Sequence, residues 1–229
     1  NHSVLELSDR DIVSYSRKIT DLKGSQKLNS KFMDIVSNYV PDLIVFGHAD
    51  LIDNKTIEFI KKNYPDTKMC QWFLDRMDGE WRYNKNRFIK KMHLMDVNFC
   101  TTDPNSLSFN KKYPTYYMPN CVDPSLERLK IYNNTFFKSD VFFAMSHGVH
   151  RGILKKGKID VREKFVKKLI KITPNIKFDF YGYDDIQPIW SEDFLVSISQ
   201  NKIGLNLSQG KSSDYYSSDR LSQLVGNGL

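Results

Sequence analysis

The chain has 229 residues, of which 40% are hydrophobic and 13% aromatic, and it carries a formal net charge of +7. This composition excludes an intrinsically disordered chain, and the length suffices for one large or two modest domains. The sequence contains no apolar run long enough to cross a membrane, its first residues lack the pattern of a signal peptide, and its lysines are scattered as on a solvated surface.

In the first half of the chain, short apolar runs alternate with amphipathic, lysine-rich stretches. A short strand is predicted at 4–7, a helix at 28–39 and a buried strand at 41–48. Further helices are predicted at 56–63, 81–94 and 106–111, and further strands at 68–74, 97–101 and 115–118. Continuous apolar strands between helices are typical of a parallel sheet covered on both faces.

A turn-rich segment at 119–124 interrupts this alternation, which then starts again. Strands are predicted at 141–145, 177–181 and 203–207, and helices at 160–172, 192–200 and 218–225. The sequence therefore predicts an α/β protein with two Rossmann-like domains, 1–125 and 126–229. We expect both to be incomplete, the first without its opening strand and helix and the second truncated at a helix end.

The cysteines and histidines suggest neither a disulfide framework nor a metal site. Cys70, Cys100 and Cys121 are odd in number and widely spaced, which fits a reducing compartment, and we expect the protein to be cytoplasmic. His147 and His150 lie close together in the sequence, but neither a carboxylate nor a cysteine stands near them.

Ligands of open α/β sheets bind beyond the carboxyl ends of the strands, so polar residues at those ends are candidates for function. In the first domain, His48 and Asp75 follow predicted buried strands and could take a proton from a substrate. Structural alternatives remain open: His48 could cap a strand end, and Asp75 could cap a helix or pair with Arg76 or Arg82.

In the second domain, the corresponding strand ends are rich in Gly, Ser, Arg and Lys, which suits a diphosphate. These segments are 146–152, 182–185, 208–211 and 215–220. Arg151 could equally be a surface cation, and Asp219 could be a plain helix N-cap.

Three motifs carry a resemblance to a known family. Pro119-Asn-Cys-Val-Asp-Pro124 resembles the Pro-Asn-Gly-Val-Asp linker motif of GT-B glycosyltransferases, with Cys121 in place of the usual Gly. Tyr181-Gly182 after a strand resembles their Tyr-Gly turn. The segment 220–228 resembles the Arg-x-Phe-Glu-Ala-Leu-Ala-x-Gly segment of the group-1 family, including its spore-maturation-type relatives.

This resemblance implies a glycosyltransferase that moves a sugar from a nucleotide-diphospho-sugar to an unknown glycan or other acceptor, in polysaccharide or glycoconjugate synthesis. The C-terminal domain would hold the donor and the N-terminal domain the acceptor, with His48 and Asp75 as catalytic candidates. Gln223 stands where the family usually has a Glu that binds the nucleotide ribose. The donor-binding residues would be Arg151, Gly182, Tyr183, Ser217, Ser218, Asp219, Arg220 and Gln223.

The resemblance also implies that the enzyme needs neither a metal nor a cofactor, because cationic side chains and a helix N-terminus would stabilise the leaving diphosphate. A non-catalytic module that binds a nucleotide or a nucleic acid is the alternative. The net charge of +7 permits this alternative, but the sequence has no basic cluster interleaved with aromatic residues, so nucleic acid is not favoured. A Gly-x-Gly-x-x-Gly turn after a strand would favour an oxidoreductase, and the sequence has none.

Overall fold

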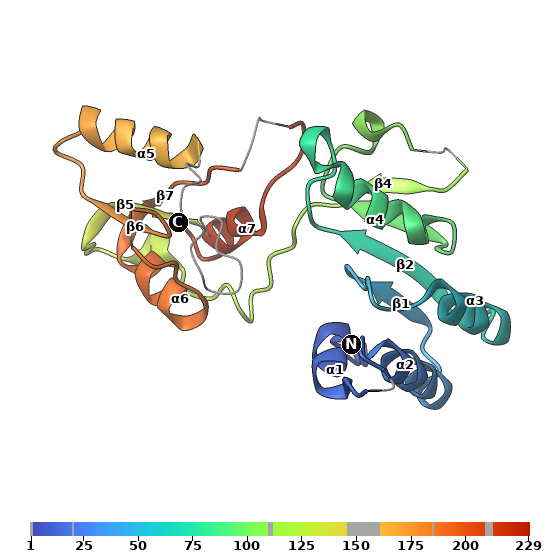
Figure 1. Cartoon of the computed structure of the whole chain (residues 1–229). Coiled ribbons are helices and arrows are strands. Elements are labelled where there is room, and N and C mark those ends of the chain that lie inside the picture. The colour runs from blue at the N-terminus through green and yellow to red at the C-terminus, as the bar shows by residue number, and fades with distance from the viewer. Residues whose placement is uncertain (1, 20, 110–111, 146–160, 185, 209–212) are drawn as a thin grey trace. The chain divides into compact units, whose positions relative to one another are not determined.

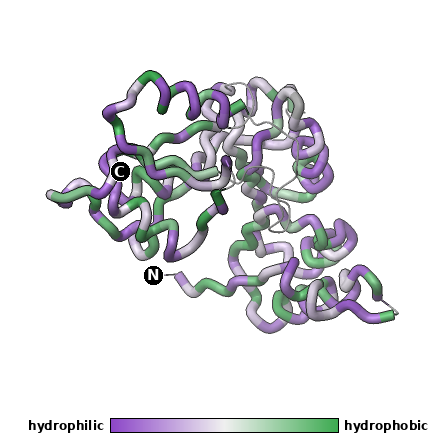
Figure 2. The backbone as a smooth tube through the Cα atoms, turned by 60° about the vertical axis from the view of Figure 1, so that its left-hand side comes forward, coloured by the Kyte–Doolittle hydropathy of each residue, from purple (hydrophilic) through white to green (hydrophobic). Residues whose placement is uncertain are grey.

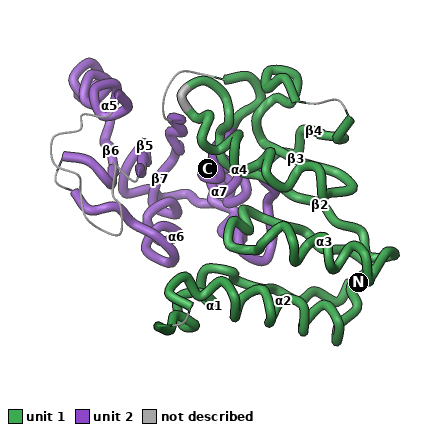
Figure 3. The backbone as a smooth tube through the Cα atoms, turned by 45° about the vertical axis from the view of Figure 1, so that its right-hand side comes forward, with its two compact units in different colours: residues 1–119, 213–216 green, residues 120–212, 217–229 purple. Residues whose placement is uncertain are grey.

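The computed structural model describes residues 2–19, 21–109, 112–145, 161–184, 186–208 and 213–229. The protein is a mixed α/β chain with two parallel sheets (Figure 1). It forms two compact units, which Figure 3 distinguishes by colour: unit 1 contains residues 1–119 and 213–216, and unit 2 contains residues 120–212 and 217–229.

Unit 1 begins with two helices, α1 (Asp9–Ser16) and α2 (Ser25–Tyr39), and then alternates strands with helices. The alternating elements are β1 (Leu43–Phe46), α3 (Asn54–Asn63), β2 (Lys68–Phe73), α4 (Arg82–Met92), β3 (Val97–Cys100) and β4 (Thr115–Tyr117). Two short 3₁₀ helices, η1 (Gly79–Trp81) and η2 (Pro104–Leu107), lie before α4 and after β3. The four strands pair in parallel in the order β1-β2-β3-β4.

This strand order places the helices of unit 1 on one face of the sheet. Right-handed crossovers that always step in the same direction must all lie on the same side. Accordingly, Phe46 and Met69 share one core cluster with apolar residues of α2 and α3, and Phe73 and Cys100 share another with residues of α4.

The opposite face of this sheet is open along its two edge strands, β1 and β4. Its side chains include Leu43, Val45 and Tyr116, which are 53%, 56% and 57% exposed. Among the described residues no helix covers these side chains, so the prediction of a sheet covered on both faces is wrong for unit 1. The reason lies in the strand order, which the apolar pattern of the strands does not reveal.

Unit 2 has a three-stranded parallel sheet in the order β6-β5-β7. Its elements are η3 (Ile131–Asn133), β5 (Ser139–Ala144), α5 (Val161–Ile172), β6 (Phe178–Tyr181), α6 (Ser191–Ser199), β7 (Asn201–Gly204) and α7 (Asp219–Gly226).

The crossovers of unit 2 change direction at β5, and the helices therefore lie on both faces. The step from β5 to β6 carries α5 on one face, whereas the step from β6 back across β5 to β7 carries α6 on the other. The core clusters agree: Phe143 packs with Val166 of α5, and Phe142 packs with Ile198 of α6 and Leu224 of α7. The prediction of a doubly covered sheet is confirmed here.

The turn-rich segment after residue 119 packs against α7. The Asn120 side chain donates to the Ser217 carbonyl at 3.1 Å, and the Ser222 hydroxyl donates to the Asn120 carbonyl at 3.1 Å. Asn227, which is fully buried, accepts from the Leu129 N–H at 3.2 Å through its side chain. Two sequence motifs about a hundred residues apart thus belong to one packed layer.

Most predicted elements match the structure to within a few residues, and three do not. The predicted strand at 4–7 is wrong, because this stretch has no regular structure and leads into α1, whose N-cap Ser8 accepts a hydrogen bond from the Asp11 N–H. The helix predicted at 106–111 is instead the 3₁₀ turn η2, which begins at Pro104. The last strand lies at Asn201–Gly204 rather than 203–207.

The helices mix polar and apolar residues at short spacing, as the tube coloured by hydropathy shows (Figure 2). Within the described part of the chain, none of the helices combines the length and the apolar character that a membrane span requires.

Candidate functional site

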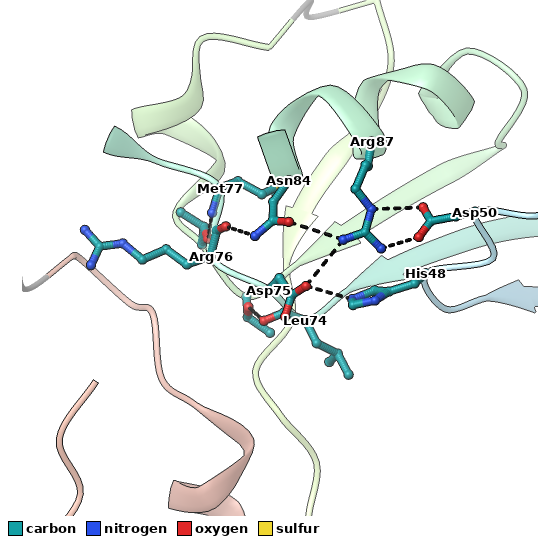
Figure 4. A network of polar contacts seen from close by, with 10 residues as sticks. His48, Asp50, Leu74, Asp75, Arg76, Met77, Asn84 and Arg87 are labelled. Carbon is teal, nitrogen blue, oxygen red and sulfur yellow. Dashed lines mark hydrogen bonds and ion pairs between the residues drawn. The ribbon is translucent and has the colours of Figure 1, made fainter. Parts of the chain in front are cut away.

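The two predicted catalytic residues meet at one edge of the unit 1 sheet. His48 follows β1 and Asp75 follows β2, and these neighbouring strands pair in parallel. Because parallel strands end at the same edge, the loops behind them bring the two side chains together. The His48 Nε2 and Asp75 Oδ2 atoms are 3.5 Å apart, and the two side chains are 27% and 47% exposed (Figure 4).

The environment of the imidazole favours a defined orientation. The His48 ring stacks on Phe73, with ring centroids 4.7 Å apart. Nε2 is buried and has no hydrogen-bond partner within the described residues. The 3.5 Å separation from Asp75 is longer than a normal hydrogen bond, but catalytic contacts commonly shorten when a substrate binds.

Arg87 of α4 joins this pair to a second carboxylate. Its guanidinium donates two hydrogen bonds to Asp50, with the Nε contact at 3.0 Å, and lies 3.6 Å from the Asp75 carboxylate. It also lies over the ring of Phe73, 5.3 Å from the centroid. Burial opposes the charged form, but the Asp50 and Asp75 carboxylates outweigh it and raise the pKa of Arg87.

Asn84 fixes the start of α4 relative to the end of β2. Its amide nitrogen donates to the Arg76 carbonyl at 2.9 Å, and its amide oxygen accepts from Arg87 at 3.2 Å. The Arg76 side chain turns away and binds Asp78.

The structure thus shows which cation lies next to Asp75. Arg76 is engaged with Asp78, and Arg82 lies about 200° around the helix axis from Asn84, so it faces away from the network. Arg87 is the residue of α4 that reaches Asp75. Sequence proximity suggested Arg76 and Arg82. The helix period turns Arg82 away from Asp75, and Arg76, which precedes the helix, pairs with Asp78 instead.

The arrangement of His48, Asp75, Arg87 and Asp50 is suited to proton transfer. If the neutral imidazole carries its proton on Nε2, facing the Asp75 carboxylate, the lone pair on Nδ1 remains to accept a proton. Arg87 lies between the two carboxylates and contacts both of them.

In unit 2, two predicted donor residues converge on a residue that was not predicted. The Ser218 hydroxyl donates to Asn206 Oδ1 at 3.1 Å, and Arg220 donates to the same oxygen at 3.3 Å. Arg220 also donates to the Leu207 carbonyl at 3.4 Å and lies 6.0 Å from the centroid of the Phe143 ring. Asn206 follows β7, so this cluster stands at the carboxyl edge of the sheet.

Gly182 and Tyr183 contribute to packing at the end of β6. Gly182 has a φ of +85°, and a Cβ there would lie 1.5 Å from the Met145 carbonyl oxygen. Tyr183 is 1% exposed, stacks on Phe180 with centroids 4.6 Å apart, and burial raises its pKa. In this conformation the Tyr183 side chain offers almost no surface to a ligand.

The remaining predicted donor residues lie near the first turns of α7, except for one. Ser217 is half-buried, whereas Asp219 and Gln223 are exposed. Ser218, rather than Asp219, holds the N-cap position, and the Asp219 carboxylate accepts from the Arg220 N–H at 2.9 Å. Arg151 lies outside the described residues.

Sequence reasoning missed Arg87 and Asn206, the residues that organise the two clusters. Arg87 lies in the middle of a helix, and no strand-end filter selects such a position. Asn206 could have been found, because a polar residue just past a strand is the signal that selected the other candidates; the misplaced last strand concealed it.

Cys70 and Cys100 are buried free thiols, and burial raises the pKa of Cys100 to about 12. Among the described residues, no group of three or more His, Cys, Asp and Glu side chains could hold a metal ion.

No protein-family model matches the sequence, and no curated protein matches it significantly.

Proposed function

We propose that the protein is a GT-B glycosyltransferase, which transfers a sugar from a nucleotide-diphospho-sugar to the hydroxyl of a glycan or another acceptor. The observation that carries the proposal is the 3.5 Å approach of His48 and Asp75, two residues that sequence reasoning had selected separately as catalytic candidates. The presence of two α/β units with parallel sheets supports it.

Unit 1 would bind the acceptor and remove its proton. His48 would accept the proton of the attacking hydroxyl on Nδ1, while Asp75 orients the ring and stabilises the imidazolium that forms. Arg87 would hold Asp75 in place as a positioning residue. Exposed fractions of 27% and 47% leave both His48 and Asp75 accessible to an acceptor.

Unit 2 would bind the donor at the point where its strand order reverses. In open α/β sheets the ligand crevice lies at such a switch point, here beyond the carboxyl ends of β5 and β7. Asn206 follows β7 and positions Ser218 and Arg220 there.

Arg220 and the N-terminus of α7 would stabilise the negative charge that develops on the leaving diphosphate without a bound metal. Gln223, three residues further along the helix, would contact the nucleoside.

A thermal-shift screen of nucleotide-diphospho-sugars against the protein tests this assignment. We expect one class of donor to raise the melting temperature. Incubation with that donor and a glycan acceptor, or with water as the acceptor of the sugar, should release the nucleoside diphosphate. Stabilisation without release would favour the non-catalytic nucleotide-binding alternative, and no stabilisation by any donor would refute the proposal.

Two substitutions locate the donor. Arg220→Ala should weaken donor binding by about 1.5–3 kcal/mol, the range of a charge-assisted hydrogen bond, and Gln223→Ala by about 0.5–1.5 kcal/mol. Arg128→Ala, an equal charge change at an exposed residue of unit 2, is the matched control. Unchanged affinity in both test variants would place the donor elsewhere.

Chelation tests the electrostatic part of the proposal. Nucleoside diphosphate release should survive removal of divalent cations. If a chelator abolishes release and Mn²⁺ or Mg²⁺ restores it, the assignment of the leaving-group charge to Arg220 is wrong.

A further inference from the structure

A cavity of about 600 Å³ lies in unit 1, between α4 and the segments that follow β2 and β3. Its wall includes Asp78 from the first segment, Leu107 from the second, and Arg82, Lys85 and Ile89 from α4. The volume is in the range that small-molecule sites occupy, and the position beyond the carboxyl ends of parallel strands is where such sites occur.

The charged groups on the wall leave a surplus of positive charge. The Asp78 carboxylate is bound by the Arg76 side chain, which lowers the pKa of Asp78 and neutralises its charge. Arg82 is exposed and makes no hydrogen bond or ion pair within the described residues. Lys85 donates to the Leu107 carbonyl and lies 5.6 Å from the Phe109 centroid, but no described carboxylate pairs with it.

The cavity is distinct from the His48 network. Arg82, Lys85, Asn86 and Ile89 follow the i, i+3, i+4, i+7 spacing of a single helix face. Asn84 and Arg87, which bind the network, lie on the opposite face of α4. One helix therefore separates the two groups of polar side chains.

We propose that this cavity binds a small ligand bearing a phosphate or carboxylate group. Arg82 and Lys85 bind the anionic group, and Ile89 and Leu107 contact the apolar part of the ligand. Unpaired cations on a concave wall bind such groups through charge-assisted hydrogen bonds. The proposal does not depend on the transfer reaction or on the nucleotide-sugar donor.

The test is a titration of the ¹⁵N-labelled full chain, followed by NMR, with inorganic phosphate, malonate and glycerol as probes. Phosphate, malonate or both should shift amide resonances of the β2–α4 and β3–β4 connections saturably, and glycerol should not. Binding of phosphate alone would assign phosphorylated ligands, and binding of malonate alone would assign carboxylates.

Single substitutions distinguish binding in this cavity from nonspecific attraction of anions to a positively charged protein. Arg82→Gln should raise the apparent Kd about tenfold, the effect of losing one charge-assisted hydrogen bond. Lys90→Gln makes the same charge change at an exposed position of α4 that does not line the cavity, and should change it less than about twofold. Asn86→Trp should block binding by filling the cavity while keeping both cations.

Lys85 also donates a hydrogen bond to the Leu107 carbonyl, so Lys85→Gln removes both a charge and this contact. Lys85→Arg is therefore its control: it keeps a cation and a hydrogen-bond donor, and should preserve binding. Absence of saturable shifts with both anions would overturn the proposal. Equal losses in Arg82→Gln and Lys90→Gln, or unchanged binding in Arg82→Gln and Asn86→Trp, would overturn it as well.

Discussion

The two units use the same elements, parallel strands joined by helices, but cover their sheets differently. Unit 1 adds its strands in one direction and leaves Leu43, Val45 and Tyr116 on an open face. Unit 2 reverses direction at β5 and buries Phe142 on one face and Phe143 on the other. Strand order alone decides this difference, because right-handed crossovers stay on one face until the direction of winding changes.

The polar clusters of the two units differ in the kinds of side chain that they contain. Unit 1 gathers ionisable groups, His48, Asp50, Asp75 and Arg87, into one network at the sheet edge. Unit 2 holds its one cation, among the residues of the cluster after β7, through the neutral amide of Asn206. The first arrangement suits proton transfer, whereas in the second the amide oxygen of Asn206 orients the Arg220 guanidinium and the Ser218 hydroxyl.

The largest effect on stability should come from Gly182, the glycine that follows β6, in contrast to Gly47, which follows β1. Gly182→Ala places a Cβ 1.5 Å from the Met145 carbonyl oxygen at a φ of +85°, and should destabilise unit 2 by more than about 4 kcal/mol. Gly47→Ala after β1 meets nothing within 4 Å and should change stability by less than about 1 kcal/mol. Urea unfolding compares them, and similar losses would show that the two strand ends are packed alike.

The next effect tests whether the units unfold separately. Asn98 in unit 1 and Asn227 in unit 2 are each fully buried and hydrogen-bonded. Replacing either by Ala leaves buried partners unsatisfied, at a cost of about 2–3 kcal/mol. Amide hydrogen exchange should show that Asn98→Ala weakens protection in unit 1 alone and Asn227→Ala in unit 2 alone. Loss of protection throughout the chain in both variants would mean that the units fold as one.

A smaller effect probes the network at the sheet edge. Arg87→Gln removes the cation that Asp50 and Asp75 share, and should destabilise the protein by about 1 kcal/mol, because both carboxylates remain partly hydrated. Arg82→Gln, on the opposite face of α4, should change the free energy of unfolding by less than about 0.5 kcal/mol. If Arg82→Gln were the more destabilising variant, the assignment of the two helix faces would be wrong.

The smallest effect is a pH dependence at Asp78. The hydrogen bond from Arg76 lowers the pKa of Asp78 below the value of about 3.9 expected in the unfolded chain. The folded state therefore binds fewer protons at this group, and its contribution to stability is complete above about pH 5 and declines as the pH falls through the folded pKa. Asp78→Asn should lack this component, so its stability deficit should shrink between pH 6 and pH 3 in urea titrations. If the stability deficit of Asp78→Asn stayed constant over this pH range, Asp78 would not contribute to the loss of stability in acid.

Local patterns predicted the positions of most helices and strands because both depend on nearby residues. The apolar spacing of 28–39 and the runs at 41–48 and 68–74 fall on α2, β1 and β2. The helix α1, which the sequence patterns did not predict, is only 8 residues long, and its N-cap Ser8 directly follows the apolar run at 4–7. At η2, the polar sequence supports a single 3₁₀ turn rather than a longer helix.

The sequence by itself determined the α/β alternation and the candidacy of His48 and Asp75, because strand ends are set by local periodicity and ligand sites follow from strand ends. Only the tertiary structure decided that the two side chains lie 3.5 Å apart, that Arg87 rather than Arg76 or Arg82 accompanies Asp75, and that one sheet is left open on one face. The physical reason is common to all three. Strand order and the rotation of a helix about its axis are fixed by packing between distant segments, which no local pattern encodes.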